Sequence, residues 1–201
     1  MGKASLMLAC RGKLLKRPLT NFTWPLKNEI LLTKSYLSLV RGKNMTKKIK
    51  FGLWYSFRNP KRWETSLNEL YSQHLQQIAW AETIGYQKVW LTEHHFCEDA
   101  HAPSILPICA AVAAKTQKIR IATGVLLLPL HNAIRVAEDT ATIDILSNGR
   151  FELGVGVGYR PAEFLGLGVD PSDRASLADE GLEIIEQLVE GKSLSYEGKH
   201  Y

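Results

Sequence analysis

Short apolar runs alternate with stretches of helical periodicity in the part of the chain that follows Lys48. The runs begin near Ile49, Lys88, Ile119 and Phe151, so they recur every 31 to 39 residues. Strands at this spacing with helices between them indicate βαβ units, in which crossover helices join parallel strands. We therefore expect an α/β fold with a parallel sheet.

Four helices are expected between and after these strands. Ser66 and Glu69 can form a capping box at the start of the first helix, and Gly85 can end it. Asparagine and glycine are common at helix starts and ends, respectively. The expected starts of the other helices are residues 104–107, Asn132 and Ala175, and Gly149 is expected to end the third helix.

The strands themselves favour one architecture. Residues 88–91 and 119–128 are almost continuously apolar, as expected of strands that are buried on both faces. A doubly wound sheet usually has a glycine-rich phosphate loop after its first strand, whereas residues 54–58 read Trp-Tyr-Ser-Phe-Arg. We therefore prefer a (β/α)8 barrel of the TIM-barrel type. Such a barrel typically needs about 250 residues, so residues 45–201 would be its N-terminal half, with only the first four βα units.

Composition supports a single globular domain. The chain has 201 residues, of which 45% are hydrophobic and 22% are charged. Its apolar runs, such as residues 125–130, are all far shorter than the roughly 20 residues of a membrane-spanning helix. The three cysteines, Cys10, Cys97 and Cys109, include no CxxC pair, which argues against a disulfide framework and a thiolate zinc site. We expect a cytoplasmic protein without a membrane partner.

Charge is distributed unevenly along the chain. Residues 1–50 hold 12 Lys/Arg and one acidic residue, whereas the rest of the chain holds 13 Lys/Arg and 19 Asp/Glu. If Arg41 and Gly42 are encoded by AGG and GGN codons, a ribosome-binding sequence precedes Met45. We therefore expect translation to start at Met45, which leaves residues 1–44 as a basic extension outside the domain. A transit-type presequence, a solvated tail and a nucleic-acid arm are the alternatives, although the scattered aromatic residues do not favour a nucleic-acid partner.

The segment after the second strand is the richest in titratable side chains. In a (β/α)8 barrel, the reactive groups lie where the strands end, and residues 93–101 read Glu-His-His-Phe-Cys-Glu-Asp-Ala-His. His94 is a candidate proton donor or base, because imidazole exchanges a proton near neutral pH; a hydrogen-bonded structural histidine is the alternative. We expect no metal, since the order is not HExxH and adjacent side chains of an extended segment point to opposite sides. Cys97 can be a nucleophile only if a base activates it.

Glycines mark the ends of the next two strands. Gly124 interrupts a buried strand, which often indicates a bulge or the close approach of a ligand or another backbone. Gly154, Gly156 and Gly158 alternate along the fourth strand, so they are expected to share one face and leave it bare for a flat ring system. Tight packing against a helix is the alternative. The dinucleotide fingerprint GxGxxG is absent from this strand, and Pro161 precedes any helix there.

Three more polar side chains lie near these strand ends. His131 precedes the expected helix cap and is interpreted as a loop histidine without a catalytic role. Arg160 can offer a cation to an anionic ligand. A surface salt bridge, with Glu163 close by in the sequence, is the alternative role for Arg160.

Four motifs, taken together, resemble the bacterial luciferase-like flavin monooxygenase family, and the resemblance extends from about Ile49 to the end of the chain. Each motif alone is unspecific, but their order and spacing are specific. The motifs are Trp90-Leu91-Thr92-Glu93-His94-His95-Phe96, then Thr123-Gly124-Val125 with Leu128-Pro129, then Ala137-Glu138 with Asp144-Ile145-Leu146-Ser147-Asn148-Gly149-Arg150-Phe151, and Gly154-Val155-Gly156-Val157-Gly158-Tyr159.

The resemblance implies a (β/α)8 barrel that binds reduced FMN, or coenzyme F420 in a sister branch, where its strands end. With reduced FMN and O2, members of the family oxygenate a small organic substrate, whereas the F420 branch transfers a hydride. The cofactor carries the chemistry, and the protein supplies position and polarity. Relatives commonly form homodimers through helices of this half, so a homodimer is expected.

The resemblance also implies roles for single residues. His94 matches the active-site histidine near the flavin. The step from Gly124 to Val125 matches a peptide bond that is often cis against the flavin ring. The strand that lies along the isoalloxazine is matched by Gly156, Val157 and Gly158.

Two departures from the family pattern leave a non-catalytic function open. Some relatives have an arginine at the position of Val157 that helps to bind the flavin phosphate. The main phosphate contacts of the family lie in the second half of the barrel, beyond Tyr201. The alternative function is therefore a truncated half barrel that only dimerises or binds flavin weakly.

Overall fold

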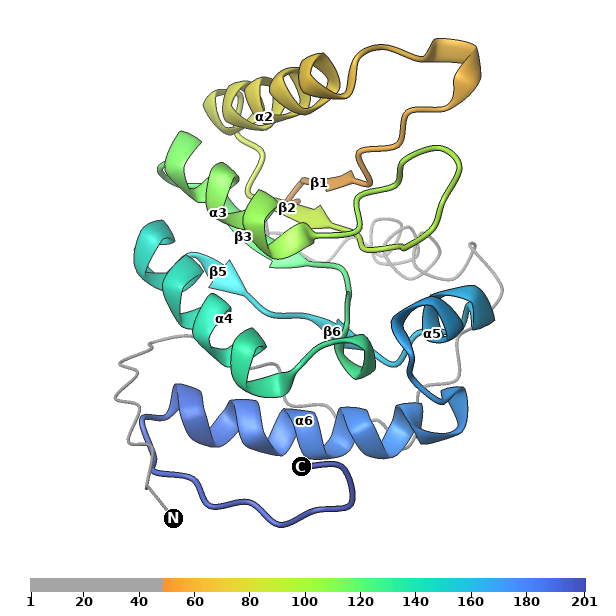
Figure 1. Cartoon of the computed structure of the whole chain (residues 1–201). Helices are drawn as coiled ribbons and strands as arrows, with labels where there is room; N and C mark the ends of the chain where they lie inside the picture. The colour runs from red at the N-terminus through yellow and green to blue at the C-terminus, as the bar shows by residue number, and fades with distance from the viewer. Residues whose placement is uncertain (1–48) are drawn as a thin grey trace, which may run out of the picture. The chain divides into compact units, whose positions relative to one another are not determined.

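The computed structural model describes residues 49–201, so the expectation for residues 1–44 lies outside the described residues. Figure 1 shows that helices and short strands alternate along this part of the chain. The strands are β1 (Gly52–Tyr55), β2 (Lys88–Leu91), β3 (Arg120–Thr123), β4 (Leu126–Leu127), β5 (Phe151–Glu152) and β6 (Val155–Gly156).

Four of the described α-helices lie close to the expected positions, and a fifth, over residues 161–167, was not expected. None of the helices in residues 49–201 is long and apolar enough to cross a membrane. The α-helices are α2 (Leu67–Thr83), α3 (Ile105–Lys115), α4 (Ala133–Ser147), α5 (Pro161–Leu167) and α6 (Arg174–Val189), and the short 3-10 helices are η2 (Lys61–Trp63), η3 (Leu128–Leu130) and η4 (Pro171–Asp173).

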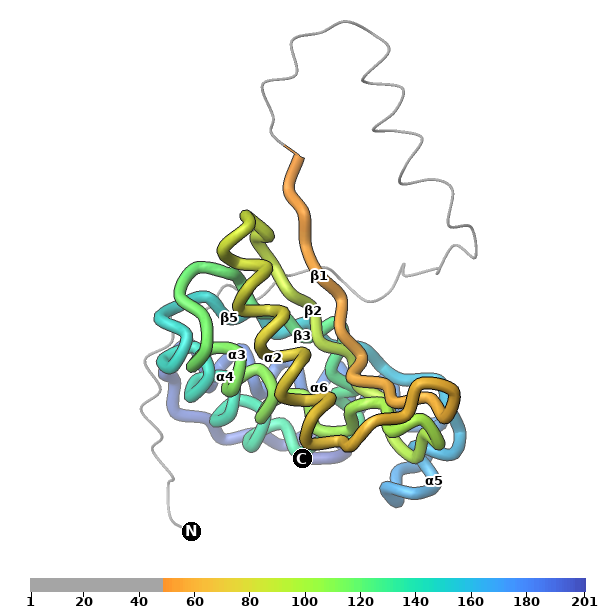
Figure 2. The backbone as a smooth tube through the Cα atoms, turned by 90° about the horizontal axis from the view of Figure 1, so that it is seen from above, coloured from red at the N-terminus to blue at the C-terminus, as the bar shows by residue number. Residues whose placement is uncertain are grey.

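The main sheet is parallel, and its strands are ordered as in the chain. The order is β1-β2-β3-β5, and β4 pairs with β6 in a second parallel ladder. Figure 2 shows β1, β2 and β3 side by side. A doubly wound sheet reverses its strand order at the switch point, and no such reversal occurs among the described strands. The α/β class with a parallel sheet is confirmed, and barrel closure stays a prediction.

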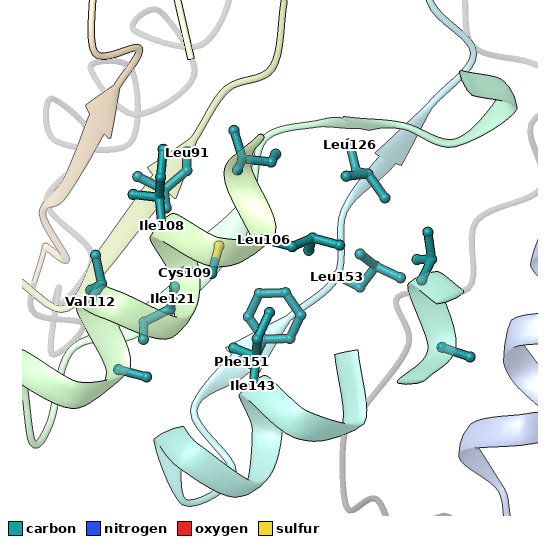
Figure 3. Packing of buried hydrophobic residues seen from close by; sticks show 14 of the residues in the cluster. Leu91, Leu106, Ile108, Cys109, Val112, Ile121, Leu126, Ile143, Phe151 and Leu153 are labelled. Atoms are coloured by element: carbon teal, nitrogen blue, oxygen red, sulfur yellow. The ribbon is translucent and has the colours of Figure 1, made fainter. Parts of the chain in front are cut away.

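Only one face of the sheet is covered by helices within the described residues. Helices α2, α3, α4 and α6 stack in chain order alongside the strands (Figure 1). On the opposite face, Trp54 is 74% exposed and its register partner Trp90 is 37% exposed. In β3, however, the consecutive residues Ile121, Ala122 and Thr123 are all buried. The expectation that both faces are buried is therefore confirmed for β3 and wrong for β2, where Trp90 is exposed. The core lies on the helical side and includes Leu91, Leu106, Ile108, Cys109, Val112, Ile121, Ile143 and Phe151 (Figure 3).

The helix caps agree only in part with those expected from the sequence. The Ser66 hydroxyl accepts a hydrogen bond from the Glu69 amide, but the Glu69 carboxylate accepts from the Thr65 hydroxyl instead of completing a capping box. The Asn132 side chain caps α4 as expected. At the end of this helix Asn148 as well as Gly149 adopts a positive φ.

The third and fourth expected strands are each split in two. The Gly124 amide still donates to the Leu91 carbonyl of β2 (2.7 Å), whereas the Leu126 amide donates to the Gly154 carbonyl (2.8 Å). The chain thus changes its hydrogen-bonding partner between these two residues. Thr123 supports this change, because its hydroxyl donates to the Gly154 carbonyl and accepts from the Gly154 amide.

Arg150 and Glu82 tie the amino-terminal edge of the sheet together. The Arg150 guanidinium donates to backbone carbonyls and one hydroxyl of the segments that precede β3 and β5. Glu82, near the end of α2, accepts hydrogen bonds from three consecutive amides just before β3. Partial burial would raise the pKa of Glu82, but these amides and Arg150 outweigh it and lower the pKa. The acceptors of Arg150 are the carbonyls of Ala113, Thr116, Ile119 and Ser147 and the Thr116 hydroxyl.

Candidate active site

The loop after β2 carries two adjacent histidines that bind to different carboxylates. His94 Nδ1 lies 2.8 Å from Glu163 Oε1, whereas His95 Nε2 lies 2.7 Å from Glu93 Oε1. Adjacent side chains of an extended segment point to opposite sides, which is why the two rings separate. The expectation that these adjacent side chains point to opposite sides is confirmed.

Glu163 fixes the orientation of His94. This carboxylate sits in the first turn of α5 and its side chain is fully buried. Its Oε1 atom accepts from His94, from the His95 amide (3.0 Å) and from Arg160 Nη1 (3.3 Å), while Oε2 is buried without a hydrogen-bond partner among the described residues. A carboxylate at Nδ1 favours a proton on that nitrogen. His94 Nε2, which has no such partner in residues 49–201, is then left for a ligand.

Glu93 is the centre of a second buried group. Its Oε1 atom lies 2.7 Å from Nε2 of both His95 and His131, and its Oε2 atom accepts from the Leu127 amide (2.7 Å). Burial alone would raise the pKa of Glu93, but the hydrogen bonds from these two histidines and the Leu127 amide lower its pKa to about 2. Glu93 is therefore a stable buried anion that joins the loop after β2 to β4 and to His131 before α4.

Glu93, His95 and His131 are also the described residues that could hold a metal ion, since their ligand atoms all lie within 4.8 Å of one another. Two histidines and one carboxylate are a known set for divalent metals. In the structure, however, both Nε2 atoms lie at hydrogen-bond distance from a single carboxylate oxygen. A nitrogen that donates its proton has no lone pair for a metal. The expectation of no metal stays a prediction, which metal analysis of the purified protein tests.

The glycines at the strand ends are crowded by different neighbours. A Cβ at Gly154 would lie 2.4 Å from the Thr123 carbonyl oxygen, one at Gly156 would lie 2.7 Å from Val125 Cγ2, and one at Gly158 would lie 3.0 Å from the Phe164 ring. The expectation that the three share one bare face is wrong, because the strand is interrupted after Glu152 and Gly158 has a positive φ. Gly154 instead allows two backbones to approach closely.

Val125 and Gly156 remain as a small apolar surface. Val125 is 39% exposed and lies against Gly156. The Gly124–Val125 peptide is cis, as the resemblance implies. Val157 is half-buried in the turn before α5. Among the interactions of the described residues, none joins the His94 side chain to Val125, Gly156 or Val157. His94 and these three residues nevertheless all lie at or just beyond the ends of neighbouring strands.

Arg160 serves the histidine loop. Its Nη1 atom donates to the His95 carbonyl (3.2 Å), to Cys97 Sγ (2.9 Å) and to Glu163. The hydrogen bond to Cys97 is the main cause that raises the pKa of Arg160. The salt bridge with Glu163 that the alternative expected is therefore present, but its carboxylate is buried, and the guanidinium also ties the segment before α5 to the loop after β2. Cys97 has no histidine or carboxylate as a hydrogen-bond partner among the described residues, so no base activates it there.

Sequence reasoning missed the two carboxylates that organise the site. Glu163 was considered only as part of a surface pair, although Pro161 followed by an acidic residue is a recognised start of a helix. That signal predicts α5, but not that its first turn reaches His94. For Glu93 the local sequence shows only the nearby His95, because its other partners, the Leu127 amide and His131, are 34 and 38 residues away. The expectation that His131 is a loop residue is confirmed, and the side chain belongs to the Glu93 group.

Comparison with known proteins identifies the family of the chain. The family model for luciferase-like monooxygenases matches residues 49–201. A curated relative, 4-hydroxyprotoasukamycin monooxygenase of Streptomyces nodosus subsp. asukaensis, is 34% identical over 144 residues, which are 72% of this chain and 38% of the relative. The chain thus spans less than half the length of that relative.

Solved structures show the same fold. The oxygenating constituent of 3,6-diketocamphane monooxygenase from Pseudomonas putida, in complex with FMN, superposes with a TM-score of 0.70 at 21% identity, over 77% of this chain and 43% of that one. The coenzyme F420 dependent tetrahydromethanopterin reductase of Methanopyrus kandleri gives 0.56 at 24% identity, over 77% and 44%. The family match and these folds lead to one conclusion: the chain belongs to the luciferase-like monooxygenase family.

Proposed function

We propose that residues 49–201 are the N-terminal half of a (β/α)8 barrel that acts as a flavin-dependent oxidoreductase on a small organic substrate. The observation that carries this proposal is the His94–Glu163 pair at the ends of the strands, which leaves His94 Nε2 for a ligand. Reduced FMN with O2 is the proposed cofactor chemistry, because the curated relative is a monooxygenase. F420-dependent hydride transfer is the alternative within the same fold.

The residues at the strand ends fit a flat cofactor. Val125 offers an exposed apolar side chain beside Gly156, where any larger residue would have to displace it. Tyr159, 76% exposed, lies beside the His94 ring with a centroid separation of 5.9 Å. An apolar surface with a few fixed polar groups at its margin is the usual composition of a cofactor site. Val125, Gly156 and His94 would therefore hold the ring system.

When bound, a reduced flavin supplies the electrons of the reaction. The protein's own contribution is orientation and proton handling. The Glu163 carboxylate holds Nδ1 of His94, so that Nε2 is the atom that accepts or donates a proton at the ligand. Glu93 keeps the loop after β2 fixed to the Leu127 amide, just beyond the Gly124–Val125 step. Both carboxylates thus act through the geometry of other groups.

The open face of the sheet supports the proposed closure of the barrel. Trp54 and Trp90 lie on this face beside Glu152, which binds Lys88 at 2.5 Å and also pairs with Arg120. Further strands that continue the parallel order would cover this face and supply the remaining cofactor contacts.

A homodimer is proposed as well, since Ile134, Ile145 and Leu146 are exposed on α4. Sedimentation of the purified chain tests this proposal.

Titration of the chain with oxidised FMN and, separately, with F420 tests the proposed function. We expect saturable quenching of FMN fluorescence by the wild-type chain. Saturable binding of F420 alone would favour the alternative cofactor. If neither cofactor binds, the chain would be a non-catalytic half barrel, and the proposed function of this chain would be wrong.

Replacing His94 separates its proposed role from cofactor affinity. His94→Gln keeps a polar side chain of similar reach but removes the titratable imidazole. In a form of the protein that turns over, we expect slower turnover, on the order of 100-fold as for loss of a general acid or base, with FMN affinity nearly unchanged. His200→Gln is the matched control, because His200 also binds a neighbouring side chain but lies in the C-terminal segment. An unaltered rate in His94→Gln would refute the role of this residue.

A further inference from the structure

A second histidine, His101, lies beside His94 and has no part in the function proposed above. It sits seven residues further along the loop that follows β2. The loop folds back on itself, because the His94 amide donates to the Ala102 carbonyl (3.3 Å) and the Ala102 amide donates to the Ser56 carbonyl (3.0 Å). Ala102 is fully buried. The backbone on the C-terminal side of His101 is therefore anchored in the core.

The His101 ring is held at two points. Its Nε2 atom lies 2.8 Å from the Thr92 hydroxyl, at the end of β2. Its ring meets the His94 ring nearly at right angles, with centroids 4.8 Å apart and an interplanar angle of 85°. Edge-to-face contacts at this separation are favourable for aromatic rings. His94 is thus held by Glu163 through one nitrogen and by His101 through the plane of its ring.

The charged groups around the pair differ on its two sides. His94 has the Glu163 carboxylate at 2.8 Å, with Arg160 on the same carboxylate and Tyr159 near the ring. On the His101 side, the Asp99 carboxylate is paired with Arg58, so its charge is largely compensated. The pKa of His101 is lowered, chiefly by burial and to a smaller extent by the nearby His94. Two imidazolium rings at 4.8 Å would repel each other.

We propose that His101 is a positioning residue for His94, held by the Thr92 hydroxyl and uncharged while His94 handles the proton at the site. This inference rests on the proposed function, since His94 needs a positioned ring only if it meets a ligand. A neutral His101 keeps the edge-to-face contact intact. Acidification that charges His101 would push the two rings apart and release His94.

A pH titration of the 201-residue chain tests whether the charge of His94 affects the protonation of His101. The protonation of His101 is monitored by NMR of labelled imidazole carbons. We expect the wild-type midpoint of His101 to lie below the ordinary histidine value of about 6.5. In His94→Gln we expect it to rise by about half a pH unit or more, the effect of removing a unit charge at this separation even in water. His200→Gln is the matched control and should leave the midpoint unchanged. An unchanged midpoint in His94→Gln would show that the charge of His94 does not act on His101, and it would overturn the proposal.

A second pair of variants tests the positioning itself. His101→Phe keeps a flat ring against His94 but cannot titrate, whereas His101→Ala removes the ring. We expect the His94 imidazole signal to stay sharp in His101→Phe and to broaden in His101→Ala. Equal behaviour of the two variants would overturn the positioning role. FMN binding is measured on the same samples, so failure of the cofactor proposal is seen separately from failure of this one.

Discussion

The two ends of the parallel sheet are fastened in different ways. At the amino-terminal edge, Arg150 and Glu82 hold backbone groups, the carbonyls and amides that lead into β3 and β5. At the carboxyl-terminal edge, Glu93 and Glu163 each hold a backbone amide as well, but they also hold imidazole rings. Backbone groups have fixed donor and acceptor roles, whereas an imidazole changes its role with protonation. One edge is thus built for stability, and the other can respond to protons and ligands.

This difference agrees with what barrels of this kind need. Residues at the amino-terminal face of such barrels contribute mainly to stability, whereas chemistry takes place at the carboxyl-terminal face. In this chain both edges contain charges that are largely or partly buried, so burial alone does not distinguish them. The hydrogen-bond partners distinguish the two edges, because Arg150 is surrounded mainly by backbone carbonyls, whereas Glu93 is held by two titratable imidazole rings. Substitutions at the two edges should therefore have different consequences.

The largest effect is expected for Arg150→Ala. The change leaves several backbone acceptors of α3, β3 and α4 without their donor. We expect the free energy of unfolding to fall by about 4 kcal/mol, in the range for breaking a buried network, with little dependence on pH between 5 and 8. Urea denaturation measures the change. Arg135→Ala is the matched control, because Arg135 is 70% exposed in its side chain and pairs only along its own helix, so its loss should cost about 0.5 kcal/mol or less.

Glu93→Gln should have a somewhat smaller effect that depends on pH. The folded pKa of about 2 lies below the ordinary value of 4.5, so the ionised carboxylate stabilises the fold above pH 4.5. That contribution, about 3 kcal/mol by linkage, is lost as the pH falls from 4.5 to 2. The variant should be less stable than wild type at pH 7, and the difference should shrink towards pH 2. A constant difference at all pH values would contradict the assignment.

The smallest effect is expected for Glu82→Gln. The side chain keeps one acceptor oxygen for the amides of residues 117–119 but loses its charge, and it is only partly buried. We expect a loss of about 1 kcal/mol, as for a capping interaction, with no effect on FMN binding. Asp139→Asn, on the exposed side of α4, is the control. A loss of FMN binding in Glu82→Gln would show that the two edges are not independent.

The sequence predicts the fold better than the site. Helix α2 and helix α4 begin at Ser66 and Asn132 as expected, because capping is a local property. An irregularity of the strand at Gly124 was expected, but the change of hydrogen-bonding partner was not, since it depends on which neighbouring backbone the Leu126 amide meets. The partners of His94 were missed for the same reason. Glu163 is 69 residues away, and only the parallel order of the strands brings α5 to the loop after β2.

The central claim is that the carboxyl-terminal edge of this sheet binds a flavin. Amide NMR of the labelled chain during titration with oxidised FMN tests it most directly. We predict that the signals of His94, Val125 and Gly156 shift in a saturable way, while those of Gln117 and Lys118 at the opposite edge stay in place. Shifts confined to the amino-terminal edge, or none at saturating FMN, would contradict the account.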